Sequence, residues 1–296
     1  MFRKSLSVCN LLAFAISLAA AADTPQTGTK LSAADIVEKN VAARGGLQAW
    51  RAVQTMSLSG KLGAGGNRRA SLPIPVPGGK SNLATLAPRR AEEAQLPFVM
   101  ELKRPRKMRF ELQFNGQTAI QVFDGANGWK LRPFLNHRVV EPYTSEEMKM
   151  ASMQADLDGP LVDYAAKGTQ VELAGMEKVE DRDTYKVKLT MKNGEAIHVW
   201  IDAQTFLESK IEGQPRRLDG TDHPVEVYFR DYRPVSGLQI AYVLETRVLQ
   251  VAKTALGLKD PPVPAEKTII DKVVVNPKLD ESLFSKPEIG AASSAN

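Results

Sequence analysis

The sequence predicts a mainly β (α+β) protein: a strongly curved antiparallel sheet, or incomplete β-barrel, whose concave side is plugged by α-helices. Apolar and polar residues alternate in many short runs, which is the period-two pattern of strands with one buried face. Turn-forming residues separate these runs about every 8 to 12 residues, the spacing of a meandering all-β chain. Helical patterns do not alternate with the strands, and this excludes a parallel sheet.

We expect a single domain over residues 32–287 of the 296-residue chain. Residues 1–22 are predicted to be a signal peptide, residues 23–31 a flexible tail and residues 288–296 a disordered tail. Residues 63–97 are rich in Gly, Pro and Ala and are predicted to be a mobile insertion. A disordered surface loop and a flap over a cavity mouth are the two interpretations of this insertion.

The N-terminal residues have the pattern of a cleaved secretory signal. Arg3 and Lys4 are positive, Leu11 to Leu18 is apolar, and Ala20-Ala21-Ala22 is a small-residue cleavage site. The apolar run is too short to span a bilayer. Cys9 is the only cysteine and lies in this segment. We therefore expect an exported protein that folds without disulfides.

Two short helices are predicted to open the domain. Ser32 is a favourable N-cap, and apolar residues recur at helical spacing until Gly45-Gly46 ends the first helix after Arg44. A second helix from Leu47 to Val53 carries Trp50.

The clearest strand signal runs from Met108 to Phe114, where every second residue is apolar. Asn115-Gly116 then supplies the two positive-φ positions of a type I′ hairpin turn, and Asn193-Gly194 is predicted to do the same later in the chain. The strands of the first half are expected to share one apolar face. They begin at Met56, cover Phe98 to Lys103 and Met108 to Phe114, and include Ile120 to Phe123 and Trp129 to Leu131. In the second half we expect strands at Val171–Leu173, Tyr185–Met191, Ile197–Ile201, Phe206–Ile211, Val225–Phe229, Leu238–Val248 and Thr268–Val275.

A polar connection after Phe134 is expected to lead into a helix from Ser145 to about Leu157, which Asp158-Gly159-Pro160 ends. Its methionines suit either core filling or a surface that adapts to variable apolar partners. On the second interpretation Met148, Met150 and Met153 form part of a lid. A Pro-rich loop is expected over residues 251–264.

The chain lacks the patterns that would indicate catalysis. His137, His198 and His223 have no metal-ligand spacing, and no nucleophile elbow, phosphate-binding loop or dinucleotide fingerprint is present. We expect no enzyme activity, no cofactor and no metal; a hydrolase site assembled from loops is the remaining catalytic alternative. The net charge is +5, but most Lys and Arg residues are scattered along the chain, and this does not favour nucleic-acid binding. The basic cluster at residues 103–107 is interpreted as a turn that blunts a strand end, or as a contact for anionic headgroups.

Apolar strand faces in an exported protein suit the transport of an acyl chain, which gains about 0.8 kcal/mol per buried CH₂. No reactive residue is needed for this function. The predicted cavity lining consists of Met56, Leu58, Met100, Met108, Phe110, Leu112, Ile120, Val122, Trp129, Val199 and Ile201.

Five segments, in this order, resemble the periplasmic outer-membrane lipoprotein-sorting proteins, the LolA-like carriers. They are residues 34–60, residues 103–129 (KRPRKMRFELQFNGQTAIQVFDGANGW), residues 158–164 (DGPLVDY), residues 199–212 (VWIDAQTFLESKIE) and residues 275–284 (VNPKLDESLF). The resemblance implies a half-open antiparallel barrel capped by helices, with lipid acyl chains or a lipoprotein in the hollow. It also implies a location in the periplasm and transfer partners at the inner and outer membranes. In the best-known carriers of that family an early-strand arginine holds the lid closed, and Arg106 and Arg109 lie near that part of the chain.

We expect a monomer. The alternative function is a non-catalytic envelope sensor or assembly module that binds protein partners on the same fold. The two hypotheses differ in the interior, which would be partly open in a carrier and filled with side chains in the protein-binding module.

Overall fold

The computed structural model describes residues 30–64, 94–133, 137–218, 220–251 and 264–288. The chain divides into residues 1–30 and residues 31–296, and the second unit contains every described helix and strand. The predicted signal peptide, most of the predicted insertion, most of the Pro-rich loop and most of the C-terminal tail lie outside the described residues.

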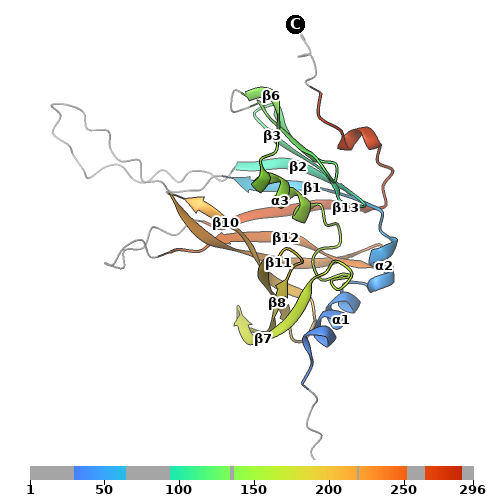
Figure 1. Ribbon diagram of the computed structural model, residues 1–296, viewed down its shortest axis with the longest axis vertical. Helices are drawn as coiled ribbons and strands as arrows, with labels where there is room; N and C mark the ends of the chain where they lie inside the picture. The colour runs from blue at the N-terminus through green and yellow to red at the C-terminus, as the bar shows by residue number, and fades with distance from the viewer. Residues whose placement is uncertain (1–29, 65–93, 134–136, 219, 252–263, 289–296) are drawn as a thin grey trace, which may run out of the picture. The chain divides into compact units, whose positions relative to one another are not determined.

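One antiparallel sheet of thirteen strands forms the domain (Figure 1). Its strands are β1 (Thr55–Ala64), β2 (Ala94–Lys103), β3 (Lys107–Phe114), β4 (Gln117–Phe123), β5 (Gly128–Arg132), β6 (His137–Pro142), β7 (Gln170–Val179), β8 (Arg182–Thr190), β9 (Ala196–Asp202), β10 (Glu208–Leu218), β11 (Thr221–Val235), β12 (Leu238–Val248) and β13 (Glu266–Val275). The order is β6-β5-β4-β3-β2-β1-β13-β12-β11-β10-β9-β8-β7, so only the pairing of β1 with β13 joins strands that are distant in sequence. The strands β6 and β7 are the two free edges, and the predicted open antiparallel sheet is confirmed.

The helices form where the sequence predicts them. The helix α1 (Ala33–Ala43) starts with a capping box, in which Ser32 and Asp35 each bond the other's backbone N–H. It is followed by α2 (Leu47–Ala52), and α3 (Ser145–Gln154) begins after a second capping box between Thr144 and Glu147. The helix α3 ends before the predicted Leu157, and the chain then runs through turns as far as Gly168. A short 3₁₀ helix, η2 (Glu281–Phe284), follows the last strand.

Several strands extend beyond their predicted limits. Residues 63–64 and 94–97, predicted to belong to the insertion, continue the β1–β2 ladder. Backbone pairing between strands does not require alternating apolar residues. The Gly, Pro and Ala content of these residues therefore gave no sign that they belong to strands. The predicted polar connection after Phe134 contains β6, an edge strand in which Val139 is 55% exposed. An edge strand has no second neighbour to pack against and therefore carries little apolar pattern.

The hairpin turns agree with prediction at one site and differ at the other. Asn115 and Gly116 have φ values of 49° and 71°, which confirms the type I′ turn. At Asn193-Gly194 only Gly194 has a positive φ, and Met191 N–H bonds the carbonyl of Glu195. The predicted two-residue turn is therefore wrong here. The Asn193 side chain instead accepts the Glu195 N–H and stabilises a longer loop.

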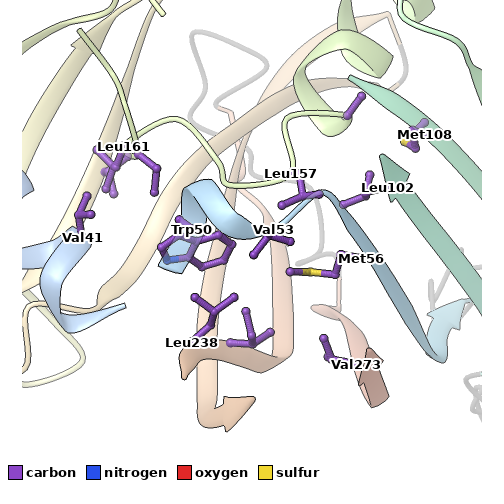
Figure 2. Packing of buried hydrophobic residues seen from close by; sticks show 14 of the residues in the cluster. Val41, Trp50, Val53, Met56, Leu102, Met108, Leu157, Leu161, Leu238 and Val273 are labelled. Carbon is purple, nitrogen blue, oxygen red and sulfur yellow. The ribbon is translucent and has the colours of Figure 1, made fainter. Parts of the chain in front are cut away.

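The core lies on one side of the sheet, under α1, α2 and the turns after α3. We call this side the inner face. Figure 2 shows Trp50 and Val53 of the helical segment against Met56 and Leu238 of the sheet, with Leu157 above Met56 and beside Leu102. Trp50 and Val53 are 1% and 2% exposed, so the helices close this end of the inner face completely.

The opposite, outer face is covered in part by the C-terminal segment. The helix η2 lies against β3, and Arg109 of β3 donates to the carbonyl of Leu283 at 3.1 Å. Glu281 binds both Lys103 and Lys107, at 2.6 and 2.7 Å. Lys103 and Lys107 of the basic cluster at residues 103–107 are thus paired with the C-terminal segment, and the cluster forms the turn between β2 and β3.

Candidate functional site

Cross-strand pairing shows which predicted lining residues share the inner face, because directly opposed residues of an antiparallel pair project to the same side. Met56 pairs with Leu102, and Leu102 pairs with Met108. One row further along the same strands, Leu58 pairs with Met100, which pairs with Phe110. Predicted residues from three strands are therefore brought together on the inner face.

Burial differs from row to row along these strands. The first row is closed under the helices, since Met56 is 3% and Met108 is 1% exposed. In the next rows Phe98 is 6% exposed, whereas Leu58, Met100, Phe110 and Leu112 pack against the core but stay partly accessible. Phe110 stacks on Phe98 with ring centroids 5.8 Å apart. We call this partly accessible set the inner strip, which consists of Leu58, Leu62, Met100, Phe110 and Leu112.

Three predicted lining residues are on the wrong face. Val122 pairs with Arg109 of β3 and with Trp129 of β5, and Ile120 pairs with Glu111. They therefore lie on the outer face, on the side that the C-terminal segment partly covers. The type I′ turn sets Ala119, Gln121 and Phe123, rather than Ile120 and Val122, opposite the inward residues of β3. The sequence did not show this because β4 is apolar on both faces.

Val199 and Ile201 of β9 belong to the inner face but are 1% and 0% exposed. They pair with Val187 and Tyr185 of β8, and Val187 is also 0% exposed. This part of the interior is filled, so these two residues are core rather than accessible lining.

The predicted lid helix α3 is held mainly by polar contacts. Ala151 is its only buried residue among those described; Met148 and Met153 are half-buried, and Met150 is 38% exposed. Met148 packs against the core, whereas Met153 accepts a contact from the Gln214 amide at 3.4 Å. The helix therefore has little apolar burial of its own to hold it on the sheet.

Two arms of the sheet hold α3 from opposite sides. Glu147 receives Lys130 of β5 at 2.7 Å and Arg132 at 3.0 Å, while Lys149 pairs with Glu195 in the β8–β9 turn. Burial opposes ionisation of Glu147, but the hydrogen bonds from Lys130 and the Thr144 N–H outweigh it and lower its pKa. Because β5 and β8 lie on opposite sides of the β1–β13 pair in the strand order, α3 bridges the two arms.

A buried polar cluster fastens the segment after α3 to the sheet and the helices. Arg104 donates to Asp158 at 2.6 Å and to the carbonyls of Val53 and Trp50 at 2.7 and 3.1 Å. Lys167 binds Asp158 and Asp156, each at 2.9 Å. Asp158, whose side chain is 3% exposed, is thus enclosed by cations.

Sequence reasoning missed Arg104 and named its neighbours instead. Arg106 is exposed and reaches α3 only through the Ser152 hydroxyl at 3.3 Å, and Arg109 is on the outer face with the C-terminal segment. The usable signal was Asp158 in the DGPLVDY segment, because a carboxylate between apolar residues needs a buried cation.

Hollows of about 360 and 430 Å³ lie in the described part of the chain. The smaller lies between the ends of β8–β11, next to Asp202 and Tyr232, and the larger lies beside Ile197, Gln214 and Val225. None of the predicted lining residues contributes to either hollow.

Two of the three histidines have side-chain contacts that the structure describes. His198 contacts both oxygens of Glu212 at 2.9 and 3.0 Å, and buried His223 bonds the carbonyl of Leu249 through Nδ1 at 3.0 Å. In the part of the chain that the structure describes, no cluster of three His, Cys, Asp or Glu side chains is placed to bind a metal ion. The helices in that part are also too short or too polar for any of them to cross a membrane.

Neither a protein-family model nor a curated protein matches the sequence. Solved structures do match. A LolA superfamily protein of Nitrosomonas europaea is 12% identical with a TM-score of 0.52, over 86% of this chain and 98% of that chain. A putative outer membrane lipoprotein-sorting protein domain of Vibrio parahaemolyticus (14% identity, TM-score 0.48, 86% and 96% covered) and a DUF1329 family protein of Desulfovibrio piger (13%, 0.49, 86% and 97%) also match.

At these identities the comparison speaks for the fold alone. The structure of the Nitrosomonas europaea protein matches over nearly its full length. This match agrees with the open antiparallel sheet of thirteen strands and with the helices on its inner face. The resemblance seen in the sequence is confirmed at this level: the chain has a LolA-like fold.

Proposed function

We propose that the protein is a non-catalytic periplasmic carrier that binds lipid acyl chains, or the acyl chains of a lipoprotein, on the inner strip and takes them toward the outer membrane. The observation that supports this proposal most strongly is the partial accessibility of the inner strip on β1–β3. The same apolar face that is closed at Met56 and Met108 stays partly accessible at Leu58, Met100 and Phe110.

The position of α3 is consistent with a lid. An acyl chain that replaces water on the inner strip gains about 0.8 kcal/mol per CH₂. The pair between Lys149 and Glu195 is half-exposed and contributes at most about 1 kcal/mol, so α3 costs little to detach from the second arm. The pair between Lys130 and Glu147 is largely buried and would keep α3 on the first arm. Met148, Met150 and Met153 would then meet the ligand as adaptable apolar side chains.

Lipid that stays bound through purification tests this proposal. We expect native mass spectrometry of protein prepared without detergent to show bound lipid, and the emptied protein to take up a fluorescent fatty acid. Met100→Glu places a charge on the inner strip and should abolish uptake. The matched control is Val139→Glu on the exposed edge strand β6, which should bind normally. Protein with native circular dichroism but neither bound lipid nor uptake would refute the carrier function.

The filled part of the interior favours the second candidate, a non-catalytic envelope module that binds protein. Val187, Val199 and Ile201 are at most 1% exposed, so the middle of β8 and β9 offers no accessible apolar surface on the inner face. A correctly folded protein that binds no lipid and is captured by a purified envelope protein would support this alternative.

A further inference from the structure

The sheet divides between β9 and β10. Their ladder ends where Val199 pairs with Ile211. From Gly213 onward β10 pairs only with β11, and its register with β11 shifts between Gly213 and Arg216. Pro215 lies in this shift and has no N–H to donate to a neighbouring strand. In Figure 1 the C-terminal end of β10 and the N-terminal end of β11 diverge from β7 and β8. We call the divergence the fork, formed by residues 196–198 of β9 and residues 212–215 of β10.

At the fork the Glu212 side chain, and not the backbone of β10, accepts the hydrogen bond from β9. The His198 N–H points toward β10 but donates to the Glu212 carboxylate at 2.8 Å, not to a backbone carbonyl. Backbone groups alternate between the two edges of a strand, so the N–H and C=O of Ala196 face the same way as those of His198. This end of β9 therefore presents a short strand edge that β10 does not cover.

The larger hollow, of about 430 Å³, lies at the fork. This volume falls within the range of ligand sites. Its lining is apolar at Ile197, Val225 and Leu249, and acidic at Glu195, Glu212 and Glu226. No Lys or Arg belongs to the described lining. Each carboxylate already has partners: Glu195 binds Lys149 and Asn193, Glu212 binds His198, and Glu226 binds Lys210 and Tyr228. A carboxylate has about four lone-pair sites, so each of them can still accept a further hydrogen bond.

We propose that the fork binds an extended peptide segment of a partner protein, which adds to β9 as a strand and places a basic side chain against Glu212 and Glu226. A strand edge supplies backbone hydrogen bonds, and the hollow supplies a site for a side chain with an aliphatic stem and a positive end. This is strand addition with charge selection. It involves no acyl chain and does not depend on the proposed function.

A fluorescein-labelled peptide of alternating valine and lysine is the probe. Fluorescence anisotropy should show saturable binding of this peptide. The matching valine–glutamate peptide should not bind, since carboxylates would face carboxylates. The valine–lysine peptide with N-methyl groups on alternate backbone amides should fail as well, because it cannot pair with a strand.

Glu212→Gln keeps a hydrogen-bond acceptor for His198 and removes the charge. It should weaken binding of the lysine peptide about tenfold, the usual loss for a charge-assisted hydrogen bond. Glu172→Gln, at an exposed carboxylate on β7, is the matched control and should leave binding unchanged. Hydrogen exchange at the Ala196 amide should slow when the peptide is bound.

Three results would overturn the proposal. They are equal binding of the lysine and glutamate peptides, binding unaffected by Glu212→Gln, and binding without protection of the Ala196 amide. If an aliphatic amine such as dodecylamine binds at the fork and the peptide does not, the site recognises a lipid headgroup and strand addition is wrong.

Discussion

At the scale of single residues, Asp158 joins the segment after α3 to the sheet and the helices through several polar contacts. It is buried between Arg104 and Lys167, and its backbone carbonyl also accepts from Arg44 at 3.1 Å. Burial alone would raise the pKa of Asp158, but hydrogen bonds from Asp156, Arg104 and Lys167 outweigh it and hold the pKa at about 2. Asp156 shows the opposite shift, since burial and the hydrogen bond with Asp158 raise its pKa.

Asp158→Asn should reduce the free energy of unfolding by about 3 kcal/mol near neutral pH, because Arg104 and Lys167 lose a buried counter-charge. Urea denaturation measures this loss. The control is Asp163→Asn. Asp163 pairs with Arg51 and is more exposed than Asp158, so this variant should lose less than about 1 kcal/mol in the free energy of unfolding. Equal losses in the two variants would show that burial of the charge is not decisive.

The same carboxylate gives a pH dependence with a definite sign. The pKa of Asp158 is lower in the folded state than its ordinary value of 3.8, so the unfolded chain binds the proton first. The stabilisation is present above pH 3.8 and is lost as the pH falls toward about 2. Denaturation curves across this window should differ between the unmodified protein and Asp158→Asn, and the stability difference should shrink with falling pH. A difference that stays constant would contradict the assignment.

At the scale of elements, α3 differs from α1 in what holds it in place. Ile36, Val37, Asn40 and Val41 of α1 are buried, whereas α3 buries only Ala151 among its residues. The ion pairs of Glu147 and Lys149 therefore position α3 more than its packing does. We therefore predict that α3 can be displaced without unfolding the sheet.

Lys149→Gln removes the contact of α3 with the β8–β9 turn. We expect a change of less than about 1 kcal/mol in the free energy of unfolding, since the pair is half-exposed. Uptake of a fluorescent fatty acid should become faster in stopped-flow measurements. High salt should accelerate the unmodified protein toward the rate of the variant, because salt screens the pair. Lys188→Gln, beside exposed Glu172, is the control and should not alter the rate.

Most elements could be predicted from the sequence because they rest on local signals. Ser32 caps α1, and Asn115-Gly116 turns the chain between β3 and β4, as expected from their residue types alone. Features that depend on pairing partners could not be predicted. The edge strand β6 carries little alternation, and the inward side of β4 depends on register with β3. Arg104 looked like one cation of an exposed cluster until the fold placed Asp158 beside it.

At the scale of the whole domain, the two arms of the sheet are continuous only through the antiparallel pair β1–β13. One arm runs from β1 to β6 and the other from β13 to β7. The helix α3 binds both, through Lys130 on the first arm and Glu195 on the second. If ligand reaches the inner strip by displacement of α3 from one arm, a covalent bond at the second contact should block entry while leaving the sheet intact.

Because the chain has a single cysteine, two introduced cysteines can be cross-linked selectively. In a Cys9→Ser background no other thiol is present. Lys149→Cys combined with Glu195→Cys can then be bridged by a cleavable thiol-specific cross-linker. The bridged protein should keep its circular dichroism spectrum and fail to take up fluorescent fatty acid, and cleavage of the linker should restore uptake.

The matched control is a bridge between Glu172→Cys and Lys188→Cys, which join directly paired residues of β7 and β8 within one arm. Such a bridge restrains a hairpin without crossing the opening, so uptake should proceed at the normal rate. Uptake that is equally fast in both bridged proteins would mean that ligand enters without movement of α3. The lid would then have to be sought elsewhere, because the contact between Lys149 and Glu195 would have no part in admitting the acyl chain.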